Sequence, residues 1–196
     1  AHIVSDQSFV QVRRHGEARK HTAQVVAVSH AADLALLTVK DPEFFKGIAP
    51  LTIGKLPQAQ QQVTVYGFPE GGDTLSITRG VVSRIEHDAY ALSSINLLAV
   101  QIDAAINSGN SGGPVLTEQR ISGVVMQSLK DSENIGYMVP APVIDHFLID
   151  LEDGRYGGVP EDGIIFQAME NDSLKRRYGM QSGQSGVLVV GVFIFC

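Results

Sequence analysis

The 196-residue sequence is poor in cysteine, in basic residues and in long apolar runs. Cys196 is its only cysteine, which excludes an intrachain disulfide framework and a multi-cysteine zinc site. Fifteen Lys and Arg stand against 21 Asp and Glu, a formal charge of −6, whereas a dedicated DNA- or RNA-binding domain is usually basic. No apolar run approaches the roughly 18 residues of a membrane-spanning helix. We therefore expect neither a nucleic-acid partner nor a membrane span.

Patterns that bind cofactors are also scarce. No group of His, Asp and Glu residues has the spacing of a metal site. No glycine-rich loop has the phosphate-binding pattern. The sequence therefore predicts a protein that uses no metal and no other cofactor.

Short strands dominate the first 140 residues. Hydrophobic residues make up 44% of the sequence and charged residues 18%, which is ordinary globular usage. Runs rich in Val and Ile alternate with Gly, Pro, Asp and Asn, which favour turns. We expect strands at residues 9–13, 24–28, 34–39, 63–68, 75–85, 97–102, 121–126 and 135–139. Such regular spacing is typical of a β-sandwich or a β-barrel, and the polar residues 54–62 predict a linker between two β units.

The remaining residues predict a helix followed by a small separate part. Pro142 is suited to begin a helix, whose apolar face would carry Val143, Ile144, Phe147, Leu148 and Leu151. Beyond the glycine-rich residues 154–160 we expect a strand at 163–169, a short helix ending at Gly179, and a strand at 186–192. The predicted parts are residues 1–56 and 57–156, two β units with the helix closing the second, and residues 157–196.

One segment, Gly109-Asn110-Ser111-Gly112-Gly113-Pro114, is the strongest candidate for chemistry. It fits the G-x-S-x-G nucleophile elbow, but that elbow must lead into a helix, whereas a strand-like run follows here. A glycine-rich turn with an ordinary serine is a second interpretation. The third is the nucleophile loop of a chymotrypsin-like serine protease, in which glycines let backbone N–H groups converge on the developing oxyanion.

Suitable partners for Ser111 occur in the order His, Asp, Ser of that third class. His2 follows a small residue, and Asp33 leads directly into an apolar strand. An unpaired carboxylate is costly in such a place, so Asp33 either caps its own backbone or pairs with another group. His30 is a rival base, but its position so close to Asp33 would require a contorted turn to reach Ser111.

Several motifs in the same order resemble the Deg/HtrA family over nearly the whole chain. They are the Asp33 segment, Gly67-Phe68-Pro69, Arg79-Gly80-Val81-Val82-Ser83, the Ser111 loop and residues 134–140. Residues 71–74 and 169–171 are most similar to the Deg-like branch of plants and some bacteria. The resemblance implies an all-β, chymotrypsin-like double β-barrel with an incomplete first barrel. A C-terminal helix and the start of an α+β PDZ domain would follow.

The resemblance also implies the roles of individual residues. Ser111 would be the nucleophile, His2 the general base and Asp33 the group that orients His2. The oxyanion hole would use the amides of Gly109 and Ser111, with Asn110 shaping the loop. A strand beside the substrate backbone, lining the primary specificity pocket, would consist of Val125, Met126, Gln127, Ser128 and Leu129. A plain core strand is the alternative for these five residues.

The resulting hypothesis is an ATP-independent serine endopeptidase that acts on unfolded or damaged proteins. By resemblance, we expect a homotrimer or larger assembly in the bacterial cell envelope, a plant organelle or the nucleus. The alternatives are a non-catalytic peptide-binding or chaperone-like module and a fragment inactive through truncation. We also expect residues 157–196 alone to bind peptide weakly or not at all, because peptide capture by strand addition needs both walls of a groove.

Overall fold

The computed structural model describes residues 1–69, 74–90, 93–107, 109–128, 136–160, 163–181 and 183–193. Its contacts group the chain into two compact units, Ala1–Gly158 and Val159–Cys196. None of the described helices is long and apolar enough to cross a lipid bilayer.

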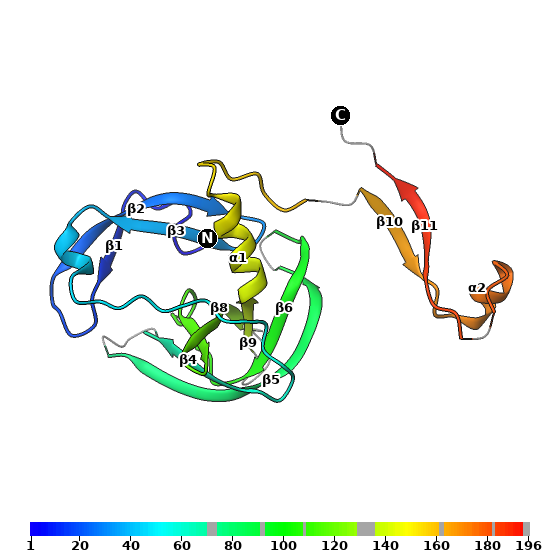
Figure 1. The fold of residues 1–196 in the computed structure, drawn as a ribbon, viewed down its shortest axis with the longest axis horizontal. Helices are drawn as coiled ribbons and strands as arrows, with labels where there is room; N and C mark the ends of the chain where they lie inside the picture. Colours follow the sequence, from blue (N-terminus) through cyan, green and yellow to red (C-terminus); the bar gives the residue numbers. More distant parts are fainter. Residues whose placement is uncertain are drawn as a thin grey trace. The chain divides into compact units, whose positions relative to one another are not determined.

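The first unit begins with an open antiparallel sheet of three strands in the order β1-β2-β3 (Figure 1). Its strands are β1 (Val10–Arg13), β2 (Lys20–Ser29) and β3 (Leu34–Val39). The β2–β3 register shifts between Val25 and Ala27, which marks a bulge that bends the pair. A 3-10 helix, η1 (Pro42–Phe45), follows, and the Asp41 side chain caps its start.

The same unit continues with a closed barrel in the order β4-β5-β6-β9-β8-β7. Alternating Val and Ile side chains point inward and fill it, with Val63, Val82, Val100 and Ile102 all fully buried. Closure gives each barrel strand a neighbour on both sides over part of its length. The strands are β4 (Gln62–Gly67), β5 (Ser76–Ala89), β6 (Asn96–Asp103), β7 (Pro114–Thr117), β8 (Arg120–Ser128) and β9 (Gly136–Pro140).

Helix α1 (Ala141–Asp150) directly follows β9 and shares one hydrophobic cluster with the sheet and the barrel. Ala32 and Leu34 of the sheet region meet Tyr90 of the barrel region in this cluster, together with Ile144 and Phe147 of α1. The helix lies beside the ends of β2 and β3 in Figure 1. The apolar side chains of the open sheet are therefore buried against side chains of the helix and of the barrel.

The second unit contains a hairpin of β10 (Ile164–Ala168) and β11 (Val187–Val192), joined through the short helix α2 (Asp172–Arg177). The side chain of Asn171 accepts hydrogen bonds from the backbone N–H groups of Ser173 and Leu174 and so caps α2.

These observations confirm the predicted all-β fold with a barrel and a C-terminal helix. Strand β7 was anticipated only as a strand-like run, and η1 was not predicted. His21 of β2 is buried next to Asp41 and Phe44. The start of a PDZ domain and the division into residues 1–56, 57–156 and 157–196 stay predictions.

Candidate active site

His2 and Asp33 form a close pair at the turn between β2 and β3 of the three-stranded sheet. His2 Nδ1 lies 2.7 Å from Asp33 Oδ2, and the His2 backbone N–H donates to Asp33 Oδ1 at 2.9 Å. The Asp33 side chain is 4% exposed and that of His2 is 33% exposed. Because Nδ1 is engaged by the carboxylate, Nε2 is the ring nitrogen left for chemistry.

The surroundings of Asp33 keep its carboxylate ionised. Burial raises the pKa of Asp33, but the hydrogen bonds that its carboxylate accepts, that of the His2 backbone N–H first and that of the His2 ring among the others, outweigh it and leave the pKa below its usual value. The Ala1 nitrogen lies 2.9 Å from Asp33 Oδ1. The carboxylate therefore carries its charge at neutral pH and can stabilise a protonated imidazole.

Ser111 lies in the loop between β6 and β7, which is pinned to β8. The Gly112 N–H donates to the Val125 carbonyl at 2.8 Å, and the Val125 N–H donates to the Gly113 carbonyl at 2.9 Å. A Cβ at Gly113 would lie 2.2 Å from the Tyr66 carbonyl oxygen, so this close approach requires glycine. The Ser111 hydroxyl donates to the Met126 carbonyl at 3.3 Å.

Two backbone amides of this loop have no acceptor among the residues that the structure describes. The N–H groups of Gly109 and Ser111 have no hydrogen-bond partner among the described residues, whereas the intervening Asn110 N–H donates to the Asn107 carbonyl at 3.1 Å. Gly109 adopts φ 95°, a conformation that glycine reaches without strain. The two free donors flank one residue, which is the pattern of an oxyanion hole.

The Asn110 side chain is buried against the end of β4. Its residue is 3% exposed, and its Oδ1 has no partner among the described residues. A Cβ at Gly67 would lie 2.4 Å from that oxygen. The carboxyl end of β4 therefore packs directly against Asn110, and Gly67 leaves the space in which the amide fits.

The His2 segment and the Ser111 loop lie next to each other. The side-chain tip of Ile3 is 3.3 Å from the position that a Cβ at Gly112 would occupy. Within the described part of the chain, no hydrogen bond joins His2 to Ser111, because the Ser111 hydroxyl is turned to Met126. Catalytic hydrogen bonds are often unmade in unliganded sites, so this arrangement is compatible with a triad.

The predicted substrate strand overlaps the carboxyl end of β8, from Val125 to Ser128. Val125 and Met126 are 2% and 4% exposed and pack in hydrophobic clusters, while the Met126 carbonyl reaches Ser111. Leu129 and the side chains of Gln127 and Ser128 lie outside the described structure. A role for these five residues in substrate binding stays a prediction.

A pocket of about 360 Å³ adjoins the His2–Asp33 pair. His30, the rival base of the sequence analysis, lines it together with Ser5 and Asp6. The described hydrogen bonds connect Asp33 to His2 and leave out His30. Within the described residues, no three His, Cys, Asp or Glu side chains gather closely enough to hold a metal ion.

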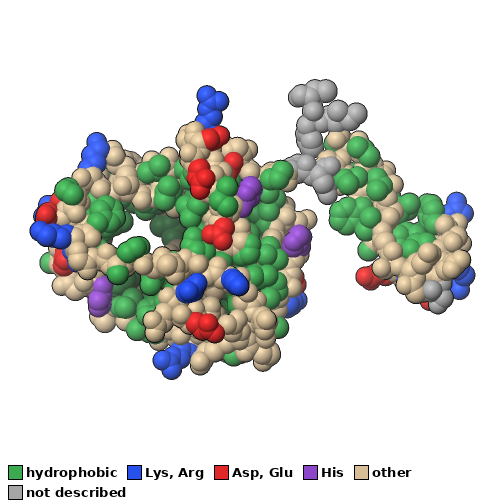
Figure 2. Space-filling view, viewed as in Figure 1, with side chains coloured by type: hydrophobic (Ala, Val, Ile, Leu, Met, Phe, Trp, Pro, Cys, Tyr) green, Lys and Arg blue, Asp and Glu red, His purple; other side chains and the backbone are tan. Residues whose placement is uncertain are grey.

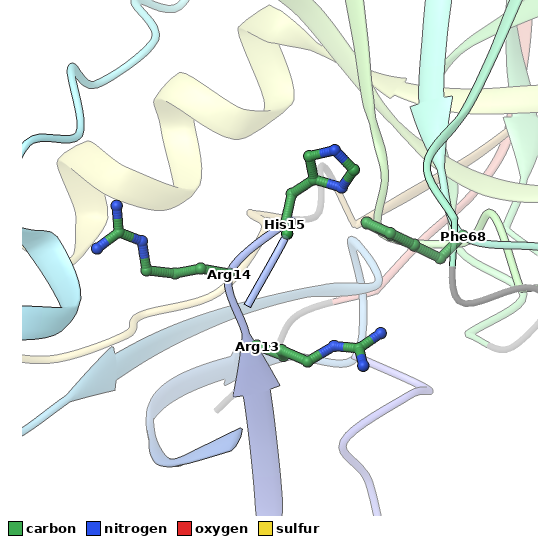
Figure 3. A pocket seen from close by; sticks show the side chains of 5 residues that line it. Arg13, Arg14, His15 and Phe68 are labelled. Carbon is green, nitrogen blue, oxygen red and sulfur yellow. The ribbon is translucent and has the colours of Figure 1, made fainter. Parts of the chain in front are cut away.

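A second pocket, of about 220 Å³, lies at the tip of the β1–β2 hairpin (Figure 3). Arg13, Arg14, His15 and Phe68 line it; the His15 and Phe68 rings lie 6.1 Å apart, and Arg14 pairs with Glu17 at 3.3 Å. Phe68 follows Gly67, which packs against Asn110. The hairpin thus meets the barrel close to the Ser111 loop.

Three residues that hold the Asp33 turn were missed by the sequence analysis: Ser29, Ser93 and Tyr156. The Ser29 hydroxyl accepts from the Ala32 N–H at 3.1 Å, a local pattern that serines before turns commonly form. Ser93 and Tyr156 reach the turn from distant parts of the sequence, and no local signal marks them.

A closed antiparallel barrel that carries a glycine-rich serine loop beside a His–Asp pair defines the class of trypsin-like peptidases. The family model for the trypsin-like peptidase domain matches residues 1–124. Together with the relatives described next, this match shows that the chain belongs to the Deg/HtrA family of serine proteases.

The chain is similar to plant and protozoan proteases. It is 45% identical to "Protease Do-like 4, mitochondrial" and 47% identical to "Protease Do-like 2, chloroplastic", both of Arabidopsis thaliana, over 96% of this chain. It covers 37% and 32% of those proteins. The "Serine protease DegP homolog" of Plasmodium falciparum is 37% identical over 98% of this chain, which covers 23% of it. The chain thus spans about a third of the length of the first two relatives.

Solved structures support the fold. The structure "HtrA-type protease AlgW with tripeptide" has a TM-score of 0.79 at 22% identity, covering 98% of this chain and 63% of that chain. A serine endoprotease from Yersinia pestis has a TM-score of 0.63 at 23% identity, covering 84% of this chain and 54% of that one.

Proposed function

We propose that the protein is an ATP- and metal-independent serine endopeptidase whose triad is Ser111, His2 and Asp33. The observation that carries the proposal is the His2–Asp33 pair, with its 2.7 Å contact through Nδ1, beside the Ser111 loop. The family and the similar proteases described above are consistent with it.

The reaction begins when the Ser111 hydroxyl turns from the Met126 carbonyl towards His2 Nε2. Ser111 Oγ attacks the carbonyl carbon of a peptide bond, while Nε2 accepts its proton. Asp33 stabilises the resulting imidazolium through Nδ1. The N–H groups of Gly109 and Ser111 bind the oxyanion, a contribution of roughly 3–4 kcal/mol for each donor.

The tetrahedral intermediate collapses when His2 donates its proton to the leaving amine, so the C–N bond breaks and an acyl-Ser111 ester remains. Water, deprotonated by His2, then attacks the ester and frees the new carboxylate and Ser111. In this second half His2 passes the proton that it took from water to Ser111 Oγ as the ester bond breaks, so water is the only reactant besides the substrate and the chain's own groups.

The proposed substrates are unfolded or damaged proteins, whose extended backbone would lie along residues Val125–Leu129. An extended segment can add to a strand through backbone hydrogen bonds with little regard for its side chains. We propose a homotrimer or larger assembly without a nucleic-acid partner, in agreement with the formal charge of −6. Sedimentation of the purified protein measures the assembly.

Labelling with a fluorophosphonate probe, together with hydrolysis of unfolded casein, tests the triad. We expect the full-length protein to be labelled and active, and Ser111→Ala and His2→Ala each to abolish labelling and to lower hydrolysis by a factor on the order of 10⁶. Ser173→Ala, a change at an exposed serine of α2, is the matched control and should behave as the wild type. A folded wild-type protein that neither reacts with the probe nor cleaves casein would refute the proposal and favour the peptide-binding module.

A further inference from the structure

The turn that carries Asp33 has a backbone that needs support. Residues 30–33 connect β2 to β3, and Asp33 adopts φ 52°. This left-handed conformation is uncommon and costly for a residue with a side chain. Such a residue keeps its geometry only when its surroundings fix it.

Three hydroxyl groups supply that support from three parts of the chain. The Ser29 hydroxyl accepts from the Ala32 N–H at 3.1 Å. The Ser93 hydroxyl, from the β5–β6 connection, donates to the Ala31 carbonyl at 3.0 Å. The Tyr156 hydroxyl, from the segment after α1, hydrogen-bonds to the Ser29 hydroxyl. Both backbone groups just ahead of Asp33 are therefore held by side chains.

Burial makes the Tyr156–Ser29 contact hard to replace. Ser29 is fully buried and Ala32 is 1% exposed, so water cannot take over a partner that is lost. The Tyr156 ring is itself fixed by Phe147 of α1, with ring centroids 5.3 Å apart at 71°. The tyrosine hydroxyl is thus presented to Ser29 from a rigid position.

We propose that Tyr156 is a positioning residue for the His2–Asp33 pair, acting through Ser29 on the backbone of the 30–33 turn. The described partners of the Tyr156 hydroxyl and ring are Ser29 and Phe147, and no described hydrogen bond joins Tyr156 to Ser111. It lies shortly before Val159, where the second unit begins. The segment that leads into the second unit is thereby fastened to the turn of the catalytic aspartate. The inference rests on the proposed function.

Other titratable groups surround the same turn and must be considered in any measurement. They are His2, His30, Asp6 and Tyr90. Burial and the charge of Asp33 raise the pKa of the Tyr90 hydroxyl, which donates to the Leu98 carbonyl at 2.6 Å. Tyr90 therefore stays neutral and does not contribute to a pH profile near neutrality.

The test is Tyr156→Phe in the full-length protein, which removes one hydroxyl and keeps the ring. We expect kcat to fall by about tenfold with KM unchanged, because a misplaced carboxylate orients and stabilises the His2 imidazolium less well. The acid limb of the kcat/KM profile should move to lower pH, since a less stabilised imidazolium loses its proton more readily. Partial unfolding would instead scale the rate equally at every pH.

A second readout does not depend on catalysis. Titration of the His2 imidazole by NMR, assigned with His2→Gln, should give a lower pKa in Tyr156→Phe than in the wild type. Ser29→Ala should lower it similarly, and the double variant should add little, because both residues act through one chain of hydrogen bonds. Tyr178→Phe, a change at a half-exposed tyrosine of the second unit, is the control that should leave the His2 titration unchanged.

An unshifted His2 titration in a folded Tyr156→Phe protein overturns the inference. This outcome is distinct from failure of the proposed function, which is an unlabelled Ser111 in the wild type. A shift in the His2 titration supports the positioning role in either case, because it reports only the His2–Asp33 pair.

Discussion

The two halves of the proposed active site lie on supports of different strength. Ser111 is carried by a closed barrel whose interior is filled by its own Val, Ile and Met side chains. Asp33, the partner of His2, lies in a turn of the open three-stranded sheet, in which Val25 and Val26 are 42% and 56% exposed. Figure 2 shows the first unit hollowed beside this sheet, with hydrophobic side chains around the opening.

This difference explains why the Asp33 turn is held by hydrogen bonds from other parts of the chain. Ala32 and Leu34 are the sheet-side members of a cluster made mostly by the barrel and α1. Ser93 and Tyr156 also approach from outside the sheet. The barrel orders its loop by its own packing, whereas the sheet is ordered by its neighbours.

The largest loss of stability is expected from a substitution that separates two strands of the closed barrel. A Cβ at Gly80 would lie 1.7 Å from the Asp103 carbonyl oxygen, a backbone atom of the neighbouring strand β6. Gly80→Ala must therefore push two strands apart, and we expect it to lower the free energy of unfolding by more than about 4 kcal/mol. Urea denaturation measures the change.

The matched control is Gly16→Ala in the β1–β2 hairpin of the sheet. An added Cβ meets nothing within 4 Å there, but the residue has φ 80°, so only backbone strain of about 1–2 kcal/mol is expected. Equal losses in the free energy of unfolding for the two variants would contradict the view that the barrel and the sheet differ in how strongly they are held together.

A milder change compares two valines. Val100 of β6 is fully buried in the barrel, while Val26 of β2 is 56% exposed. Val100→Ala should cost about 2–3 kcal/mol through lost burial and a cavity. Val26→Ala should stay within about 0.5 kcal/mol. A large loss on changing Val26 would show that the exposed face of the sheet is covered in solution.

Much of the fold could be predicted because the relevant signals are local. A short run of mostly apolar residues predicted β3 at its observed bounds, Leu34–Val39, and the predicted apolar face of α1 contains the buried Ile144 and Phe147. Strand β7 is only four residues long, too short for a clear period. The burial of His21 depends on its contacts with Asp41 and with Phe44 of η1. These residues are distant from His21 in the sequence, so a local pattern does not reveal the contacts.

For the candidate site, the sequence predicted the residues and their partners but not the orientation of their side chains. The order of His2, Asp33 and Ser111 and the glycines around Ser111 pointed to three loops, and the His2–Asp33 contact follows the predicted partnership. The orientation of Ser111 towards Met126 was not foreseen, because a hydroxyl rotamer has no sequence signature. The hydroxyls of Ser93 and Tyr156 were missed because their contacts span long stretches of the chain.

The smallest expected effect is the dependence of the sheet on the charge of Asp33. Burial raises the pKa of Asp33, but the hydrogen bonds that its carboxylate accepts, that of the His2 backbone N–H first, hold it below the ordinary value of 3.8. Ionised Asp33 therefore stabilises the fold above that value, and the contribution is lost as pH falls through the lower, folded pKa. We expect the free energy of unfolding of the wild type to exceed that of Asp33→Asn near neutral pH and the difference to shrink in acid.

In hydrogen exchange, the β2–β3 amides should lose protection before those of β5 and β6, because the affected contacts tie the His2 segment to the sheet. A difference that grows on acidification, or loss of protection in the barrel first, would contradict the view that the sheet is the half that depends on such contacts.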